Sequence, residues 1–297
     1  MIKHLRELLD LSKGKGKRLA VAVAQDEVVL KAVDSAAREE IVVPILVGDE
    51  RKIHEEAEKV GVDVSGYEIV HADGVEEAAA KAVELAASGK AELLMKGKLQ
   101  TAQIMRAVLK EEYGLRTGMT MGMVSVFEIP EFPRLLIVSD AGMTIAPTLE
   151  QKVDLIKHTI RVARVLGIET PKVAVVSAVE TVNPKIPATL DAALLAKMAD
   201  RGQIKGAIVD GPFALDNVVS KEAAEHKGIE SPVAGEADVI ITPDIDAGNI
   251  LYKALIFLAR AKSASTILGA KVPIVLTSRA DSDETKLYSI ALTAALA

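Results

Sequence analysis

Short apolar runs alternate along the chain with longer segments whose apolar residues recur at helical spacing. Leu19–Ala24 is one such run, and after it Val29, Val33 and Ala36 fall on one face of a helix. Uninterrupted apolar runs of this kind suit parallel strands that are covered on both faces. The first third of the chain is therefore predicted to hold strands at Leu19–Ala24, Ile41–Val47, Tyr67–His71 and Ala91–Met95, and helices at Asp26–Arg38, Glu50–Val60, Val75–Ala87 and Thr101–Glu111.

The alternation changes in the middle of the chain. Met123–Ile129 and Leu135–Ser139 have strand character, and the Pro-rich segment between them favours an antiparallel hairpin. A long helix is predicted next, over residues 148–166, because Thr148 and Gln151 have the spacing of a capping box. The hairpin and this helix are the expected junction between two domains.

The strand–helix pattern then returns. It predicts strands at Lys172–Val176, Gly206–Val209, Asp238–Ile241 and Pro273–Thr277, and helices at Ala188–Asp200, Asn217–His226, Asn249–Ala261 and from Asp283 onward. We therefore expect an α/β protein with two open, mostly parallel-sheet domains.

The composition of the chain excludes several classes of function. The chain has 297 residues, with 36 Lys and Arg against 42 Asp and Glu, so its net charge is −6, and it has no cysteine. Disulfides, cysteine-ligated metals and a cysteine nucleophile are thereby excluded. With four Phe, four Tyr and no Trp, the acidic chain lacks the basic surface and the stacking rings of a nucleic-acid binder. The charged N-terminus does not resemble a secretory signal, and no apolar stretch suits a membrane span, so we expect a cytoplasmic protein without membrane partners.

Polar residues after the predicted strands are the candidates for chemistry, because ligands of open α/β sheets bind beyond the carboxyl ends of strands. They include Lys96 in a Lys-Gly-Lys turn, Asp140 before a small-residue turn, and Ser278 with Arg279 after the last strand. Each also has a simpler interpretation: a solvated loop, an Asp-capped turn, or an ion pair of Arg279 with Asp281 or Asp283. The motifs of P-loop, dinucleotide-binding and GxSxG proteins are missing, and the five histidines have no metal-ligand spacing.

Taken in order, these segments resemble the phosphate acetyltransferase and phosphate butyryltransferase family. The matching segments are Lys96–Thr101 with Arg106, Gly114–Gly118, Ser139–Pro147, Asp210–Pro212 with Ala214–Asn217, Pro243–Asp244 with Gly248–Asn249, and Ser278–Arg279 with Lys286–Ser289. The resemblance covers nearly the whole chain, and Lys96–Thr101 and Gly114–Gly118 are more similar to the butyryl branch.

The resemblance implies a reversible reaction in which acyl-CoA and phosphate give acyl phosphate and CoA, with butyryl or a similar short chain as the acyl group. It implies an architecture like that of isopropylmalate dehydrogenase, with residues 1–145 plus 266–297 in one domain, 146–265 in the other, and the active site in the cleft between them. CoA is then a substrate, no cofactor is permanently bound, no metal is needed, and a homo-oligomer is expected.

The same resemblance assigns roles to the candidate residues. Arg279 would grip the phosphoryl group, Ser278 would help orient the reacting carbonyl or thiol, and Arg106 would meet a CoA phosphate. Asp140, at the end of a predicted strand, is a further candidate catalytic residue. The expected substrate-binding and CoA-binding residues are Lys96, Thr101, Arg106, Arg116, Asp244 and Asn249.

The sequence departs from the family at the general base. The acetyl branch has an Asp seven residues after the serine, and Thr285 occupies that position here. Asp140, Asp283 and Glu284 are nearby substitutes that the sequence offers. Three alternatives stay open: a phosphate acetyltransferase, an isopropylmalate-type dehydrogenase, and a non-catalytic two-domain ligand binder.

Overall fold

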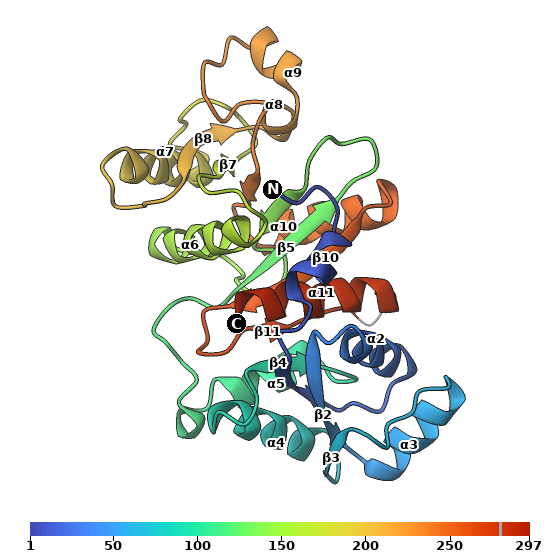
Figure 1. The fold of residues 1–297 in the computed structure, drawn as a ribbon. Coiled ribbons are helices and arrows are strands. Elements are labelled where there is room, and N and C mark those ends of the chain that lie inside the picture. The colour runs from blue at the N-terminus through green and yellow to red at the C-terminus, as the bar shows by residue number, and fades with distance from the viewer. Residues whose placement is uncertain (279–280) are drawn as a thin grey trace. The chain divides into compact units, whose positions relative to one another are not determined.

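The chain folds into two compact units, which are drawn in Figure 1. The structure is a computed structural model that describes residues 1–278 and 281–297. The terminal unit comprises Leu5–Gly118 and Ser263–Ala297, and the central unit comprises Met1–His4 and Met119–Lys262. Residues 119–145, which the sequence analysis grouped with the first domain, thus belong to the central unit. They do so because their two strands pair with each other and one of them pairs with a strand further along the central unit.

The terminal unit contains a mostly parallel sheet with strand order β3-β2-β1-β4-β11-β10. Only the β10–β11 pair is antiparallel among the described pairings of this unit. The strands are β1 (Lys17–Ala22), β2 (Val42–Gly48), β3 (Glu68–His71), β4 (Leu93–Lys96), β10 (Lys262–Leu268) and β11 (Ile274–Val275). The helices are α1 (Glu7–Ser12), α2 (Glu27–Arg38), α3 (Glu50–Lys59), α4 (Val75–Ala87), α5 (Thr101–Val108), η1 (Glu111–Tyr113) and α11 (Asp283–Leu296).

The strand order reverses direction beside β1, and this reversal creates a binding position. The chain runs outward from β1 to β3 and then returns to β4 on the other side of β1. Because parallel crossovers are right-handed, α2 and α3 cover one face of the sheet and α4 covers the other. The loops after β1 and β4 therefore lead to opposite faces of the sheet. The space between them, at the carboxyl edge, is where open α/β proteins bind ligands.

The central unit contains a second mostly parallel arrangement, with strand order β5-β6-β9-β7-β8. Its strands are β5 (Gly122–Glu128), β6 (Leu136–Ser139), β7 (Lys172–Val176), β8 (Ile208–Phe213) and β9 (Val239–Ile241), and its helices are α6 (Leu149–Val165), α7 (Pro187–Asp200), α8 (Leu215–Val219), α9 (Lys221–His226), α10 (Ile245–Lys253) and η2 (Ala254–Leu258). The predicted antiparallel hairpin is confirmed as β5 and β6. The capping box of Thr148 and Gln151 is also present at the start of α6.

Three elements differ from the sequence expectations. The helix predicted at 217–226 is broken at Ser220, whose side chain caps α9. The helix predicted at 249–261 begins earlier, at the Asp244 cap, and its last turn is a π-helix. β10 was not predicted, because Ser263, Ser265 and Thr266 interrupt the apolar pattern although all three are buried. In the described part of the chain, no helix is long and apolar enough to cross a membrane.

Candidate active site

A small cavity of about 80 Å³ lies at the reversal point of the terminal unit. It is formed by the segments that follow three neighbouring strands, β1, β4 and β11, together with α2 and α11. Its lining residues are Asp26, Val29, Lys96, Gly97, Lys98, Thr277, Ser278 and Lys286. The structure therefore brings together Lys96 and Ser278, two predicted site residues that are 182 positions apart in the sequence.

Lys96 is the last residue of β4 and is only 5% exposed. Its ammonium group donates to the carbonyl oxygens of Leu99 at 3.1 Å and of Gly97 at 3.4 Å. Gly97 is needed because a Cβ there would lie 2.3 Å from the carbonyl oxygen of Val23. A side chain at this position would push the Lys96 loop away from β1, so the Lys-Gly-Lys turn seats a buried cation at the edge of the sheet.

Lys286 is a second buried cation of this cavity, and the sequence analysis did not assign it a role. It lies in the first turn of α11, is 3% exposed, and donates to the carbonyl oxygens of Asp281 at 2.8 Å and Ser278 at 3.1 Å. The backbone NH of Ser278 donates to Oδ2 of Asp281 at 2.6 Å. Lys286 thus holds the backbone of both Ser278 and Asp281. Arg279, the predicted phosphate-gripping residue, lies outside the described residues.

Burial lowers the pKa of Lys286 from its usual range, while the negative charges of Asp281, Asp26 and Asp283 oppose that shift. In the described part of the chain, its hydrogen-bond partners are carbonyl oxygens and no carboxylate pairs with it. Lysine is almost never this deeply buried unless it is paired. An anion in the cavity would add negative charge beside this ammonium group.

Asp26 supplies a carboxylate to the same cavity. It caps α2, and its Oδ1 accepts hydrogen bonds from the backbone NH groups of Val29 at 3.1 Å and Val28 at 3.2 Å. This residue was not predicted, although its position two residues after the first predicted strand was a usable signal. The cavity therefore contains one carboxylate and two buried ammonium groups.

Asp140 lies in the central unit, directly after β6, and is 2% exposed. Its Oδ1 accepts from the NH groups of Gly142 at 2.8 Å and Met143 at 3.0 Å. Its Oδ2 accepts from the NH of Thr144 at 3.0 Å and from the Thr144 hydroxyl at 2.8 Å. Burial raises the pKa of Asp140, and these hydrogen bonds act in the opposite direction. Both carboxylate oxygens are engaged, so Asp140 holds the turn 140–144 in place.

Two further predicted residues support the same turn from α10. Asp244 caps α10 by accepting from the NH of Ala247 at 2.9 Å. Asn249 donates through Nδ2 to the carbonyl oxygen of Ala141 at 3.1 Å. The structure therefore brings together Asp140, Asp244 and Asn249 around the carboxyl ends of β6 and β9, which are adjacent and parallel.

The other predicted residues belong to the terminal unit and are exposed or half-buried. Thr101 is the first residue of α5 and is half-buried, and Arg106 is exposed in its last turn. Arg116 is exposed and pairs loosely with Glu111 at 3.7 Å. Among the substitutes for the general base, Asp283 is exposed in the first turn of α11, and Glu284 accepts from the Tyr288 hydroxyl at 2.9 Å. None of these residues lines the cavity of Lys96 and Lys286.

The cavity at the reversal point of the sheet contains two buried cations and a serine, which suit the binding of a small anion. Comparison with known proteins identifies this protein as one of the enzymes that transfer acyl groups to phosphate. The family model "Phosphate acetyl/butaryl transferase" matches residues 3–80 and 71–294. This chain belongs to that family, which acts on acyl-CoA and phosphate.

Individual relatives cover the chain from end to end. It is 61% identical to the phosphate acetyltransferase of Thermotoga maritima, over 99% of both chains. It is 51% identical to the phosphate butyryltransferase of Clostridium acetobutylicum, over 100% of this chain and 99% of the other. The fold is similar to the crystal structure of a branched-chain phosphotransacylase from Enterococcus faecalis V583, with 33% identity, a TM-score of 0.82, and coverage of 94% and 98%.

Proposed function

We propose that this enzyme reversibly transfers a butyryl or similar short-chain acyl group between CoA and inorganic phosphate, and that the cavity of Lys96 and Lys286 binds the phosphate. The observation that carries the assignment of the site is the pair of lysines, both at least 95% buried, in one cavity of about 80 Å³ with Ser278. An ammonium group has three NH donors, and Lys286 uses two of them on carbonyl oxygens. The third is directed to the phosphate in this proposal.

The reaction needs phosphate held in one orientation and shielded from water. A phosphate oxygen attacks the thioester carbonyl carbon, the new C–O bond forms, the C–S bond breaks, and CoA leaves as a thiolate that takes up a proton. In this step, the ammonium groups of Lys96 and Lys286 offset the negative charge of the phosphate, and the Ser278 hydroxyl orients the acyl carbonyl. Arg279 completes the grip on phosphate, as the family resemblance implies. Arg106, Arg116 and Thr101 are proposed to meet the CoA portion.

In the reverse direction a base must take the thiol proton. A free thiol has a pKa of about 8.5, so only a few per cent of it is thiolate at neutral pH. Asp26 is the carboxylate that lines the phosphate cavity, and its Oδ2 is not used in capping α2. We therefore propose Asp26 as the proton acceptor, in place of the Asp whose position Thr285 occupies. Asp140, Asp244 and Asn249 have a positioning role, because their polar atoms hold backbone groups.

Acetyl is the second candidate for the acyl group, and the 61% identity to a phosphate acetyltransferase favours it. The experiment is to follow CoA release, started by phosphate, from acetyl-, propionyl-, butyryl- and isobutyryl-CoA. One methylene changes discrimination by about 1–3 kcal/mol, or about 10- to 200-fold in kcat/KM, so the series separates the candidates. The highest kcat/KM with acetyl-CoA would assign the enzyme to the acetyl branch.

The phosphate site is tested separately through Lys286→Met, which keeps the length of the side chain and removes its donors. We expect the KM for phosphate to rise by about tenfold or more, equivalent to about 1.4 kcal/mol, and kcat to fall because the Ser278 loop loses its anchor. Because burial lowers the pKa of Lys286, the wild-type KM for phosphate should begin to rise at a pH below 10.5, where an ordinary lysine is still charged. Lys286→Met should lack that rise.

The exposed Lys90 provides a matched control, since Lys90→Met removes a charge from the same unit outside the cavity. An unchanged phosphate KM in Lys286→Met, in a variant that melts like the wild type, would remove Lys286 from the proposed phosphate site.

A further inference from the structure

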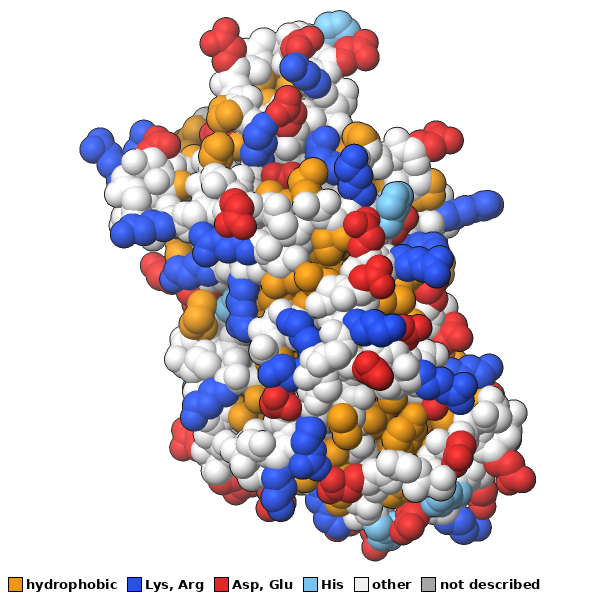
Figure 2. Space-filling view, viewed as in Figure 1, with side chains coloured by type: hydrophobic (Ala, Val, Ile, Leu, Met, Phe, Trp, Pro, Cys, Tyr) orange, Lys and Arg blue, Asp and Glu red, His pale blue; other side chains and the backbone are white. Residues whose placement is uncertain are grey.

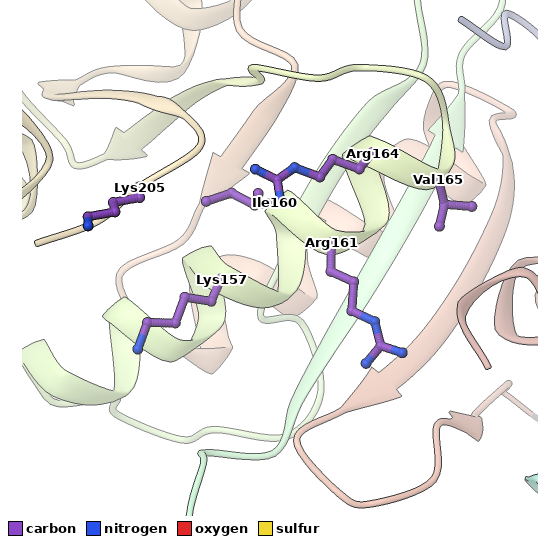
Figure 3. A pocket seen from close by; sticks show the side chains of 6 residues that line it. All are labelled: Lys157, Ile160, Arg161, Arg164, Val165 and Lys205. Atoms are coloured by element: carbon purple, nitrogen blue, oxygen red, sulfur yellow. The ribbon is translucent and has the colours of Figure 1, made fainter. Parts of the chain in front are cut away.

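A group of cationic side chains lies on the outer face of α6. Lys157, Arg161 and Arg164 project from the helix, and Lys205 approaches from the connection between α7 and β8. With Ile160 and Val165 they line a cavity of about 470 Å³, shown in Figure 3. Lys and Arg side chains gather over α6 in Figure 2 as well. We call these six residues the α6 basic cavity.

Cations follow one another along the exposed face of α6. Lys157 and Arg161 are four positions apart and Arg161 and Arg164 are three apart, and like charges at these spacings repel one another. The helix dipole favours cations only in the last turn, so it accounts for Arg164 alone. It does not account for Lys157, two turns before the end, or for Lys205 on another element.

Among the described residues, carboxylate pairing is weak or absent for three of these cations, Lys157, Arg164 and Lys205. Lys157 pairs with Asp154 at 3.3 Å, but the Lys157 side chain is 51% exposed, and such pairs contribute little. Arg164 and Lys205 have no ion-pair partner within residues 1–278 and 281–297. Two positive side chains of this cavity are therefore available to a ligand.

The fold leaves space for the Arg164 side chain. A Cβ at Gly206, next to Lys205, would lie 2.3 Å from a guanidinium nitrogen of Arg164, and Gly206 has a φ of +85°, which disfavours other residues. Glycine at 206 thus lets the α7–β8 connection, which carries Lys205, approach the guanidinium closely. Figure 3 shows Arg164 extended alongside Ile160, with Lys157 and Arg161 on the lower edge of the helix in that view.

We infer that the α6 basic cavity binds a small organic diphosphate, separately from the acyl-transfer site. A volume of about 470 Å³ lies in the usual range for small-molecule sites and exceeds what a single phosphate needs. Arg164, with its planar guanidinium, and Lys205 contact the diphosphate. Ile160 and Val165 offer apolar surface to the organic part. The ligand class is therefore an ADP-like anion rather than free pyrophosphate.

The charge of the whole chain argues against a large polyanion at this position. The net charge is −6, so the α6 basic cavity is a local positive region on an acidic protein. A nucleic acid would meet the surrounding negative field over a long distance, whereas a small anion interacts within about one Debye length, roughly 8 Å at physiological salt.

The test is isothermal titration of the intact enzyme with ADP and, in parallel, with pyrophosphate, in chloride buffer of about 0.15 M ionic strength. The wild type should bind ADP more tightly than pyrophosphate. Arg164→Gln combined with Lys205→Gln should weaken ADP binding by about tenfold or more. Lys185→Gln combined with Arg201→Gln removes two exposed charges of the same unit outside the cavity and should leave ADP binding unchanged.

Acyl transfer is the second readout, and it separates this proposal from the proposed function. The Arg164/Lys205 double variant should keep the wild-type KM for acyl-CoA and the wild-type melting temperature, because both side chains are exposed. Lys286→Met should show the opposite pattern, with ADP binding retained and the phosphate KM raised. Equal ADP affinity in wild type and double variant would overturn the proposal, as would pyrophosphate binding as tightly as ADP, or a raised KM for acyl-CoA in the double variant.

Discussion

Asp26 has one observed role and one proposed role. Its Oδ1 caps α2, and its carboxylate lines the cavity that is proposed to bind phosphate. A side chain that keeps the cap and loses the charge separates the two roles. Asparagine does so, because its amide oxygen still accepts from the backbone NH groups and it caps helices as well as aspartate does.

We predict that Asp26→Asn lowers kcat for acyl transfer from acyl phosphate to CoA by about 10²- to 10⁴-fold, the usual contribution of a general base. Its free energy of unfolding should stay within about 0.5 kcal/mol of the wild type, since the cap is kept. Asp49→Asn is the control, because Asp49 caps α3 in the same way outside the cavity. Wild-type kcat in Asp26→Asn would leave the thiol proton to another group.

Only two of the predicted site residues line the cavity of the terminal unit. Lys96 and Ser278 were identified because each follows a predicted strand. Lys286 belongs to a segment that matches the family, but no role was predicted for it. Its burial depends on how α11 packs beside β11 and α2, and sequence spacing does not express that packing.

At the scale of the element, α6 shows why some helices were predictable and others were not. Its capping box, its length and its apolar periodicity are local signals, and all three predict a helix at this position. The inner face is less regular, because it buries polar groups. Lys152 is 3% exposed and pairs with Asp191 at 2.6 Å, and His158 is 5% exposed with Nε2 at 2.8 Å from the Thr120 carbonyl oxygen.

His158 makes the stability of this helix depend on pH. Burial lowers the pKa of His158 below its usual 6.5, so as pH falls the unfolded chain binds the proton first. We predict that the free energy of unfolding falls as pH decreases from about 6.5 toward the folded-state pKa, by at most about 1.4 kcal/mol per pH unit for one group. Chemical denaturation across this range measures it.

His158→Gln should flatten the pH dependence in that window, because glutamine can donate to the Thr120 carbonyl oxygen and does not titrate. His54, exposed on α3, provides the comparison, and His54→Gln should keep the wild-type slope. Identical slopes in His158→Gln and the wild type would show that other groups control the acid stability.

At the scale of the whole molecule, the absence of cysteine limits the mechanism. The enzyme cannot form an S-acyl intermediate on its own chain, and the reacting thiol belongs to CoA. We predict that incubation with iodoacetamide, followed by its removal and then the addition of CoA, leaves acyl transfer at the untreated rate. CoA treated with iodoacetamide in the same way should be inactive as a substrate. Loss of activity in the treated enzyme would point to an essential nucleophile of another type.

The boundaries of the two units differ from the predicted domain boundaries because strands far apart in the sequence pair with each other. A boundary at 145/146 follows the change in local pattern, from hairpin to long helix. In the structure the β5–β6 hairpin instead belongs to the central unit, because β6 pairs in parallel with β9, about 100 residues later. Pairing over that distance leaves no local mark in the sequence.

The sequence by itself determined the α/β class, most of the strands and helices, the absence of thiol chemistry and the family, because these depend on local periodicity, composition and short motifs. The tertiary structure decided which residues share a site. Parallel strands bring their carboxyl ends together regardless of sequence separation, so Asp26, Lys96 and Ser278 meet at one edge of a sheet. Burial, which turns Lys286 from a surface charge into a cavity cation, is likewise a property of packing that no single segment contains.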